Sequence, residues 1–183
     1  MYTSNRIHVA AIAVIAATVL AACSVQPPAA KLPALGAAVS AEEVARWDIS
    51  IPPSGAGLPP GSGSVKQGEA VYAAKCESCH GPKGAGKPAD ALVGGIGSLA
   101  TATPVRTVGS YWPYATTLFD YTRRAMPITS PLSLSNDEVY AVTAYVLFVN
   151  GIIPADATMN AQSLPAVKMP NRDGFVSDWP PRR

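Results

Sequence analysis

Cys76-Glu77-Ser78-Cys79-His80 is the stretch that decides the fold of this 183-residue chain. Two thiols separated by two residues can each add to one vinyl group along one edge of a porphyrin. The imidazole of the next residue then lies under the iron as its proximal ligand. We therefore predict one covalently attached haem c, held by Cys76 and Cys79, with His80 bound to the iron.

The same five residues have two alternative interpretations. A zinc site needs four ligands, and beyond residue 22 the sequence has no second Cys-x-x-Cys pair and no His-x-x-x-His pair to complete it. A thioredoxin-like redox pair follows the buried strand of a βαβ unit, and no such pattern surrounds Cys76. Both alternatives fit the surrounding sequence less well than haem attachment does.

Residues 1–22 are predicted to be a secretion signal. Arg6 supplies the positive start, and the apolar core that follows is too short for a membrane span of ~20 residues. The end of this core, Leu20-Ala21-Ala22-Cys23, resembles the bacterial lipoprotein box. The resemblance implies cleavage before Cys23 and lipidation of its thiol, whereas an ordinary cleavage site beside an incidental cysteine is the alternative.

The three cysteines and the charge limit the remaining possibilities. Lipidation is the expected role of Cys23, and haem attachment is the expected role of the other two cysteines. No cysteine is then left for a disulfide. Cytochromes c are completed outside the cytoplasm, so we expect a protein on the periplasmic side, anchored to the inner or the outer membrane. Without residues 1–22, the chain has 13 basic and 12 acidic residues. A net charge of about +1 does not indicate a protein that binds nucleic acid.

The rest of the chain is predicted to form a tether, one domain and a tail. Residues 23–63 are rich in proline and glycine and read as an extended tether, interrupted by a short helix near residues 41–47. Residues 64–153 form the monohaem domain. Residues 154–183 form an irregular C-terminal tail.

Three helices are expected in the domain. The capping boxes Ser64-Val65-Lys66-Gln67 and Ser135-Asn136-Asp137-Glu138 begin the first and the last helix, and Asn150-Gly151 ends the last one. A middle helix is expected to begin at Tyr111-Trp112-Pro113 and to stop at Met126-Pro127. The domain is therefore predicted to be all-α.

These features resemble class I cytochromes c. In that fold the first helix crosses the last, and a glycine on the first lets an aromatic residue of the last come close. Gly68 and Tyr72 match the first helix, and Tyr145 matches the last. The resemblance implies the class I cytochrome c fold, with loops that enclose the haem.

The second iron ligand is expected to be a methionine. His8 lies in the predicted signal, which leaves no second histidine, and a thioether favours ferrous iron. Met126 matches the Met-Pro loop before the last helix of class I members, and Met169, in the tail, remains the alternative. Simple packing is the ordinary role of any one methionine. An apolar cavity is then expected between His80 and Met126.

One feature on the His80 side departs from the class I pattern. Class I members commonly place a proline whose carbonyl accepts the Nδ1–H bond of the proximal histidine, which fixes the imidazole. Asp90 stands at that place here. The acceptor is therefore expected to be a backbone carbonyl near Pro88 or Asp90.

Longer stretches resemble a narrower family, the cytochrome subunit of sulfane dehydrogenase in the thiosulfate-oxidising system. They are residues 107–121, 123–127, 137–141 and 167–175. The resemblance implies single-electron transfer from a periplasmic molybdenum dehydrogenase subunit that acts on sulfur compounds. Well-known members carry two haem motifs and this chain carries one. No nucleophile–base set is present, so the chain is not expected to be an enzyme by itself.

Two other functions remain open. The first is a lipid-anchored shuttle between other respiratory complexes, such as a downstream cytochrome, and a terminal oxidase. The second is a gas-binding or sensory haem protein, which needs an open sixth position and is disfavoured by Met126. The aromatic segment of residues 112–121 and the tail of residues 169–175 are the expected contacts with a molybdenum subunit, and packing of the tail on the domain is the alternative.

Overall fold

The computed structural model describes residues 36–176 and residue 179, so the predicted signal peptide and Cys23 lie outside the described residues. The chain divides into a segment that ends at Val44 and a compact unit that begins at Ala45. Helix α2 (Ala41–Trp47) starts after Ser40, whose Oγ accepts the Glu43 N–H bond at 3.1 Å. Within the described residues, no helix has both the length and the apolar character that crossing a membrane requires.

Helices α3 (Val65–Lys75) and α7 (Asn136–Val149) begin at the two predicted capping boxes. Ser64 Oγ accepts the Gln67 N–H bond at 3.3 Å, and Gln67 Oε1 accepts the Ser64 N–H bond at 2.9 Å. The Ser135–Glu138 box has the same two bonds. Both predictions of a helix start are confirmed.

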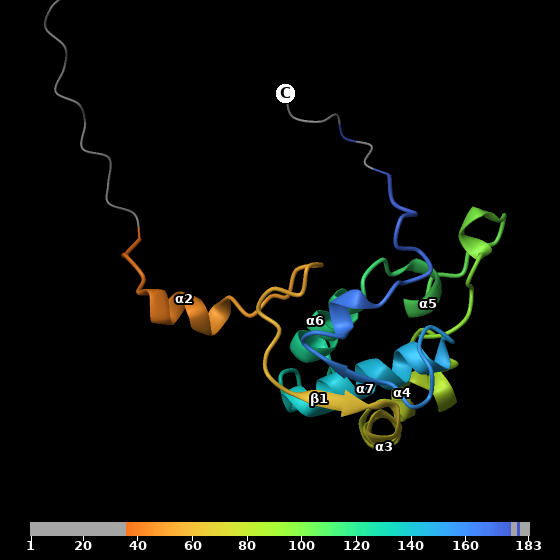
Figure 1. The fold of residues 1–183 in the computed structure, drawn as a ribbon, viewed down its shortest axis with the longest axis horizontal. Helices are drawn as coiled ribbons and strands as arrows, with labels where there is room; N and C mark the ends of the chain where they lie inside the picture. The colour runs from red at the N-terminus through yellow and green to blue at the C-terminus, as the bar shows by residue number, and fades with distance from the viewer. Residues whose placement is uncertain (1–35, 177–178, 180–183) are drawn as a thin grey trace, which may run out of the picture. The chain divides into compact units, whose positions relative to one another are not determined.

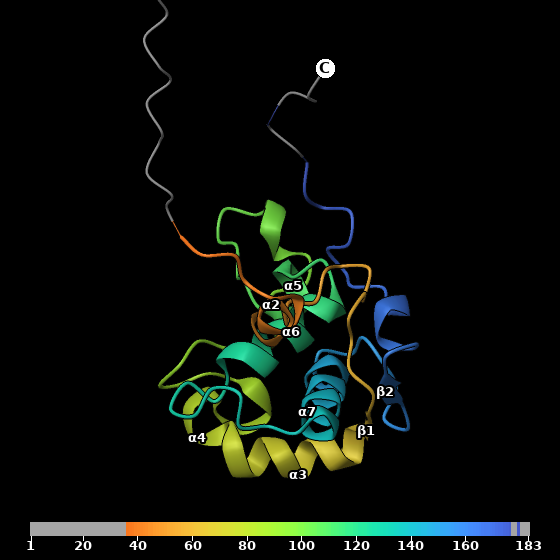
Figure 2. The ribbon, with the colours of Figure 1, turned by 90° about the vertical axis from the view of Figure 1, so that its left-hand side faces the viewer.

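The first and last helices of the domain cross, as predicted. Helix α3 is seen end-on in Figure 1 and lengthwise in Figure 2, where it runs across α7. A Cβ on Gly68 would lie 1.8 Å from Ala141 O and 2.8 Å from Tyr145 Cβ, so only glycine permits this approach. The rings of Tyr72 and Tyr145 meet beside the crossing, 5.1 Å apart between centroids.

The middle of the domain differs from the single expected helix. Helix α5 (Val108–Tyr111) ends before Trp112, and α6 (Ala115–Ala125) begins after Tyr114. The expected start at Tyr111 is wrong because a residue before proline disfavours the helical conformation, and Trp112 is extended with ψ 125°. Helix α5 has its own capping box, in which Thr107 Oγ1 accepts the Ser110 N–H bond at 3.2 Å.

The described residues also contain a short antiparallel strand pair beside α7. Strand β1 (Ser62–Ser64) pairs with β2 (Thr158–Asn160), and Gly63 lies opposite Met159. A Cβ on Gly63 would lie 2.2 Å from Ala141 N, so this strand also requires glycine for its approach to α7. The domain is therefore mostly helical, with a few residues of strand.

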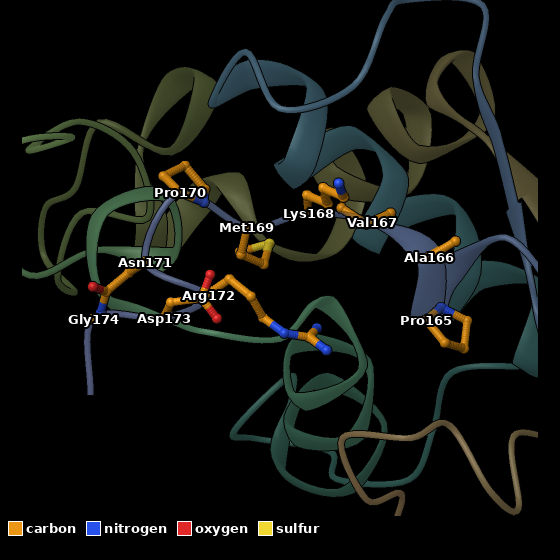
Figure 3. Close-up of a pocket in the computed structure, with 10 residues that line it drawn as sticks. All are labelled: Pro165, Ala166, Val167, Lys168, Met169, Pro170, Asn171, Arg172, Asp173 and Gly174. Atoms are coloured by element: carbon orange, nitrogen blue, oxygen red, sulfur yellow. The ribbon is translucent and has the colours of Figure 1, made fainter. Parts of the chain in front are cut away.

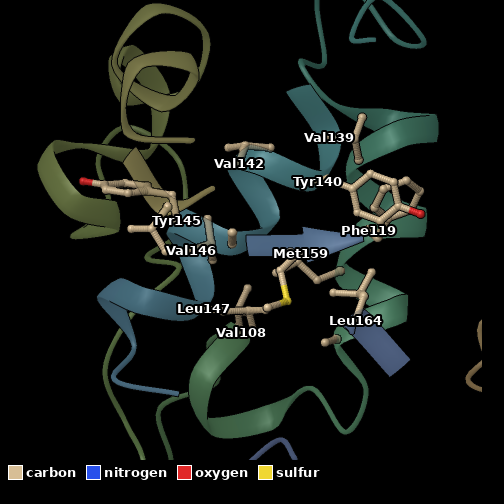
Figure 4. Packing of buried hydrophobic residues seen from close by; sticks show 14 of the residues in the cluster. Val108, Phe119, Val139, Tyr140, Val142, Tyr145, Val146, Leu147, Met159 and Leu164 are labelled. Carbon is tan, nitrogen blue, oxygen red and sulfur yellow. The ribbon is translucent and has the colours of Figure 1, made fainter. Parts of the chain in front are cut away.

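The core surrounds α7. All its residues from Val139 to Leu147 are buried, and the ring of Tyr140 lies 4.5 Å from that of Phe119 on α6. Met159 of β2 and Leu164 point into the same cluster (Figure 4). Leu164 belongs to the 3₁₀ turn Leu164–Ala166; two more such turns are Pro82–Gly84 and Ser98–Ala100.

Residues 49–60 pack on the rest of the compact unit, although they were expected to belong to the tether. Ile51 is buried, and its N–H bond donates to Asp120 Oδ1 at 2.8 Å. Tyr140 Oη–H donates to Pro59 O at 2.9 Å. The compact unit therefore includes the proline-rich segment that directly precedes β1.

The C-terminal tail packs on the domain in the same way. Leu164 and Met169 are buried, and Asn171 Nδ2 donates to Tyr111 O at 2.8 Å. The ring of Phe175 meets that of Tyr111 edge-on, with 5.2 Å between centroids. The tail thus covers the end of α5.

Candidate functional site

A cavity of about 360 Å³ lies beside α4 (Glu77–His80). Cys76, Cys79, His80 and Met126 all line it. Much of the remaining wall is aliphatic and comes from Leu92, Val108, Leu118, Val142 and Val146. The apolar cavity expected between His80 and Met126 is therefore present, and its volume is within the range of about 300–1,000 Å³ of small-molecule and cofactor pockets.

A single helical turn brings the three residues of the motif to this wall. Cys76 ends α3, and its carbonyl oxygen accepts the N–H bonds of Cys79 at 3.1 Å and His80 at 3.0 Å. Burial raises the pKa of the Cys76 thiol to about 11, whereas Cys79 is exposed. Both thiols are free and face the same cavity, as attachment to a single planar group requires.

The loop that follows α4 holds the His80 ring. His80 Nδ1 lies 3.0 Å from Asp90 O, so the acceptor expected near Pro88 or Asp90 is the Asp90 carbonyl. A proton on Nδ1 leaves the Nε2 lone pair available to a metal. Two backbone bonds fold the loop back onto the motif, from Gly86 N–H to His80 O at 2.7 Å and from Ala89 N–H to Cys79 O at 2.8 Å.

Tyr72 connects α3 to this loop. Its hydroxyl donates to Gly81 O at 2.8 Å, and its ring lines the cavity. Burial, followed by the neighbouring Cys76 thiol, raises the pKa of Tyr72 to about 12. Sequence analysis matched Tyr72 only to the helix crossing, although its position four residues before Cys76 places it on the same helical face as the motif.

The three methionines beyond residue 22 lie in different places. Met126 directly follows α6 and lines the cavity. Met169 is buried outside it and lines a different hollow of about 500 Å³, formed by residues 165–174 (Figure 3). Met159 is buried in β2. The structure thus brings Met126, and neither of the others, to the cavity that His80 lines.

The end of α6 that leads to Met126 is fixed by charged side chains. Arg124 Nε donates to Asp120 Oδ1 at 3.0 Å, and Arg124 Nη2 donates to Asp120 Oδ2. Burial alone would raise the pKa of Asp120, but hydrogen bonds from Arg124 and from Ile51 N–H lower it below its usual value. Arg123 donates to Ile49 O at 3.4 Å, so both arginines are engaged within the protein.

Comparisons with known proteins agree with this geometry. The family described as cytochrome C oxidase, cbb3-type, subunit III matches residues 63–146. The chain is also similar to a chain in the crystal structure of the sulfane dehydrogenase SoxCD from Paracoccus pantotrophus. The identity is 42% and the TM-score 0.75, over 80% of this chain and 73% of that one. No curated protein matched the chain.

The helix crossing, the Cys-x-x-Cys-His motif and the cavity define a class I c-type cytochrome, an electron-transfer protein with covalently bound haem c. Within that class, the chain belongs to the same family as the matched chain of sulfane dehydrogenase SoxCD. The predicted fold class and cofactor are both confirmed.

Proposed function

We propose that Cys76 and Cys79 would hold one haem covalently and that His80 and Met126 would be the ligands of its iron. The residues fit the group because two free thiols, an imidazole and a thioether line one largely apolar cavity. The bound haem supplies one-electron exchange at its iron. The Asp90 carbonyl holds the His80 imidazole in one tautomer, and the aliphatic wall of the cavity keeps water away from the haem.

This cytochrome is the electron-accepting subunit of a periplasmic molybdenum dehydrogenase that acts on sulfur compounds such as sulfane or sulfite. The observation that carries the proposal is the 42% identity and TM-score of 0.75 to a chain of SoxCD. Haem ligation alone does not require the specific stretches that resemble the sulfane dehydrogenase subunit, residues 107–121 and 167–175. The chain passes electrons on and converts no substrate itself.

The contact surface for the dehydrogenase is formed by residues 112–121 and 169–175. The rings of Trp112 and Tyr121 meet edge-on, 5.7 Å between centroids, and both line the cavity. The Arg172 guanidinium lies over the Tyr114 ring at 4.4 Å, and Phe175 is 53% exposed. Aromatic and arginine side chains are the usual anchors of an interface that survives purification.

The test is a pull-down of the tagged holoprotein from native membrane extract. The eluate should contain molybdenum, and sulfite or thiosulfate should reduce its haem. A preparation that holds no molybdenum protein and is reduced only by other respiratory complexes would instead identify a shuttle. Oxygen or carbon monoxide binding to the untreated ferrous protein would identify an open sixth position.

The double variant Arg172→Ala with Phe175→Ala tests the contact surface. Its haem spectrum should be unchanged, and the lost ring contacts should lower its stability by about 1 kcal/mol, while co-purification with the dehydrogenase is lost. Lys66→Ala with Ile96→Ala is the control, because it also removes one exposed cation and one half-exposed apolar side chain. Early unfolding with the partner still bound would show that the tail is only structural.

The protein is lipid-anchored through Cys23 on the periplasmic side of the inner or outer membrane. Cys23→Ala should block lipoprotein processing and move the cytochrome from the membrane fraction to the soluble fraction, because about 0.8 kcal/mol per buried CH₂ of acyl chain is lost. Processing is measured by mass spectrometry of the N-terminus. Unchanged processing and unchanged membrane recovery would contradict the anchor.

A further inference from the structure

One amide at the end of α7 connects two parts of the cavity wall. Asn150 is 8% exposed, and its Nδ2 donates to Val146 O at 2.9 Å and to Leu92 O at 3.1 Å. Both acceptor residues line the cavity, Val146 from α7 and Leu92 from the loop that follows the haem motif. Asn150 Oδ1 is buried and has no hydrogen-bond partner among the described residues.

The neighbours of the amide fix its orientation. Two carbonyl oxygens face its nitrogen, and rotating the group by half a turn would place Oδ1 against both of them. Its oxygen is packed against α5, where a Cβ on Gly109 would lie 2.2 Å from Oδ1. A buried acceptor without a partner is costly, so its presence calls for a compensating role.

The Leu92 bond leads directly to His80. Leu92 N–H donates to Gly84 O at 2.8 Å, so its backbone is held on both sides, by Gly84 and by Asn150. Two residues earlier, Asp90 O lies 3.0 Å from His80 Nδ1. The position of the carbonyl that orients the imidazole therefore depends on the anchor at Leu92.

We propose that Asn150 is a positioning residue of the haem site, which holds the Asp90 carbonyl against His80 by fixing Leu92. The proposal rests on the assignment of His80 as iron ligand. A carbonyl that accepts the Nδ1–H bond raises the basicity of the imidazole and so stabilises ferric iron. Releasing the loop weakens that bond, and the reduction potential of the haem rises.

The test uses the holoprotein with Asn150→Leu, which removes the donor, and Asn150→Asp, which keeps the shape but turns an acceptor toward the two carbonyls. Spectroelectrochemistry should give a higher reduction potential for both variants. In the ferrous protein, exchange of the His80 Nδ1 proton with solvent, followed by NMR, should be about tenfold faster, as for the loss of one ordinary hydrogen bond.

Gly109→Ala is the second variant, in case the Asn150 variants do not fold. Its Cβ displaces the amide without removing it, and the potential should again rise. Thr143→Val is the matched control, because Thr143 Oγ1 is also buried on α7 without a partner but does not line the cavity. It should change neither the potential nor the exchange rate.

The proposal is overturned if the Asn150 and Gly109 variants only lower the melting temperature, with potential and exchange as in the parent protein. Failure of the underlying assignment gives a different result. In that case His80→Ala would keep the parent spectrum, and no Nδ1 proton of His80 would respond to the iron oxidation state in any variant.

Discussion

The two walls of the cavity that carry the proposed iron ligands are held in different ways. On the His80 side, the loop of residues 81–92 is tied to the motif and to two helices. Tyr72 Oη–H, His80 Nδ1 and Asn150 Nδ2 each bond a carbonyl of this loop, at 2.8, 3.0 and 3.1 Å. Backbone bonds from Gly86 and Ala89 return to the motif itself.

The Met126 side is more open. Met126 N–H donates to Thr122 O at 3.1 Å, and Ser130 N–H donates to Pro127 O at 2.8 Å, both within a few residues of their partners. Ile128 is 74% exposed and Leu132 60% exposed. Segments with exposed side chains and local bonds open at a lower free energy than the core. The His80 wall of this haem site is therefore the more rigid one, and the Met126 wall is expected to open first.

The largest expected effect is on the order in which the two walls open. Three side-chain hydrogen bonds of about 1 kcal/mol each hold the loop of residues 81–92 and, within the described part of the chain, have no counterpart in the loop of residues 126–132. The free energy of local opening should therefore be about 3 kcal/mol higher for the first loop than for the second. In guanidinium chloride, the weak red-edge band of methionine-ligated ferric haem should therefore vanish before the helical circular dichroism does. Coincident transitions would contradict the comparison.

Two tyrosines allow a matched test of the rigid wall. Tyr72 and Tyr140 each donate to a backbone carbonyl, Gly81 O at 2.8 Å and Pro59 O at 2.9 Å, but only Tyr72 lines the cavity. Tyr72→Phe and Tyr140→Phe should each cost about 1 kcal/mol of unfolding free energy. We expect the reduction potential to change in Tyr72→Phe alone; equal changes in both would mean that the rigid wall has no special effect on the haem.

The smallest expected effect concerns an ion pair between α3 and α7. Lys75 Nζ lies 2.8 Å from Glu138 Oε1, and this bond, together with those from Ser135, lowers the pKa of Glu138 from 4.5 to about 2. The folded-state pKa is depressed, so the stabilisation is present above pH ~4.5 and is lost as pH falls toward ~2. Because both side chains are partly exposed, it amounts to only about 0.5 kcal/mol.

Lys75→Met keeps the apolar stem and removes the charge. At pH 7 it should unfold slightly more easily than the parent protein. The difference in melting temperature should shrink as the pH falls toward 2, where the Glu138 carboxylate is about half protonated, and should disappear below that pH. A difference that persists unchanged at pH 2 would mean that packing of the side chain, rather than its charge, is responsible.

The parts of the fold that could be predicted from the sequence are those specified by local chemistry. Ser64 and Ser135 begin α3 and α7 because a hydroxyl and a side chain three residues later satisfy the free N–H groups of the first turn. Gly68 was matched to the helix crossing by the resemblance to class I members, and the structure gives the physical reason, because only a glycine admits the other backbone there. Cys76, Cys79 and His80 were selected by their spacing and Met126 by its resemblance to the Met-Pro loop of class I members, and all four line one cavity.

The rest depends on contacts between distant residues. No sequence pattern near Ile51 indicates that its N–H bond donates to Asp120. The proline-rich segment that contains Ile51 was therefore expected to be part of an extended tether. Strand β1 has three residues, too few for an alternating pattern. The Asp90 carbonyl was identified only by the folded loop, since every residue offers a carbonyl.

The central claim is that His80 and Met126 are the two iron ligands. The most direct measurement is the red-edge absorption band of the ferric holoprotein in the parent, in Met126→Ala and in Met169→Ala. We predict that Met126→Ala loses the band, whereas Met169→Ala keeps it and loses about 2–5 kcal/mol of stability from a buried site. A band that survives Met126→Ala and disappears in Met169→Ala would contradict the account.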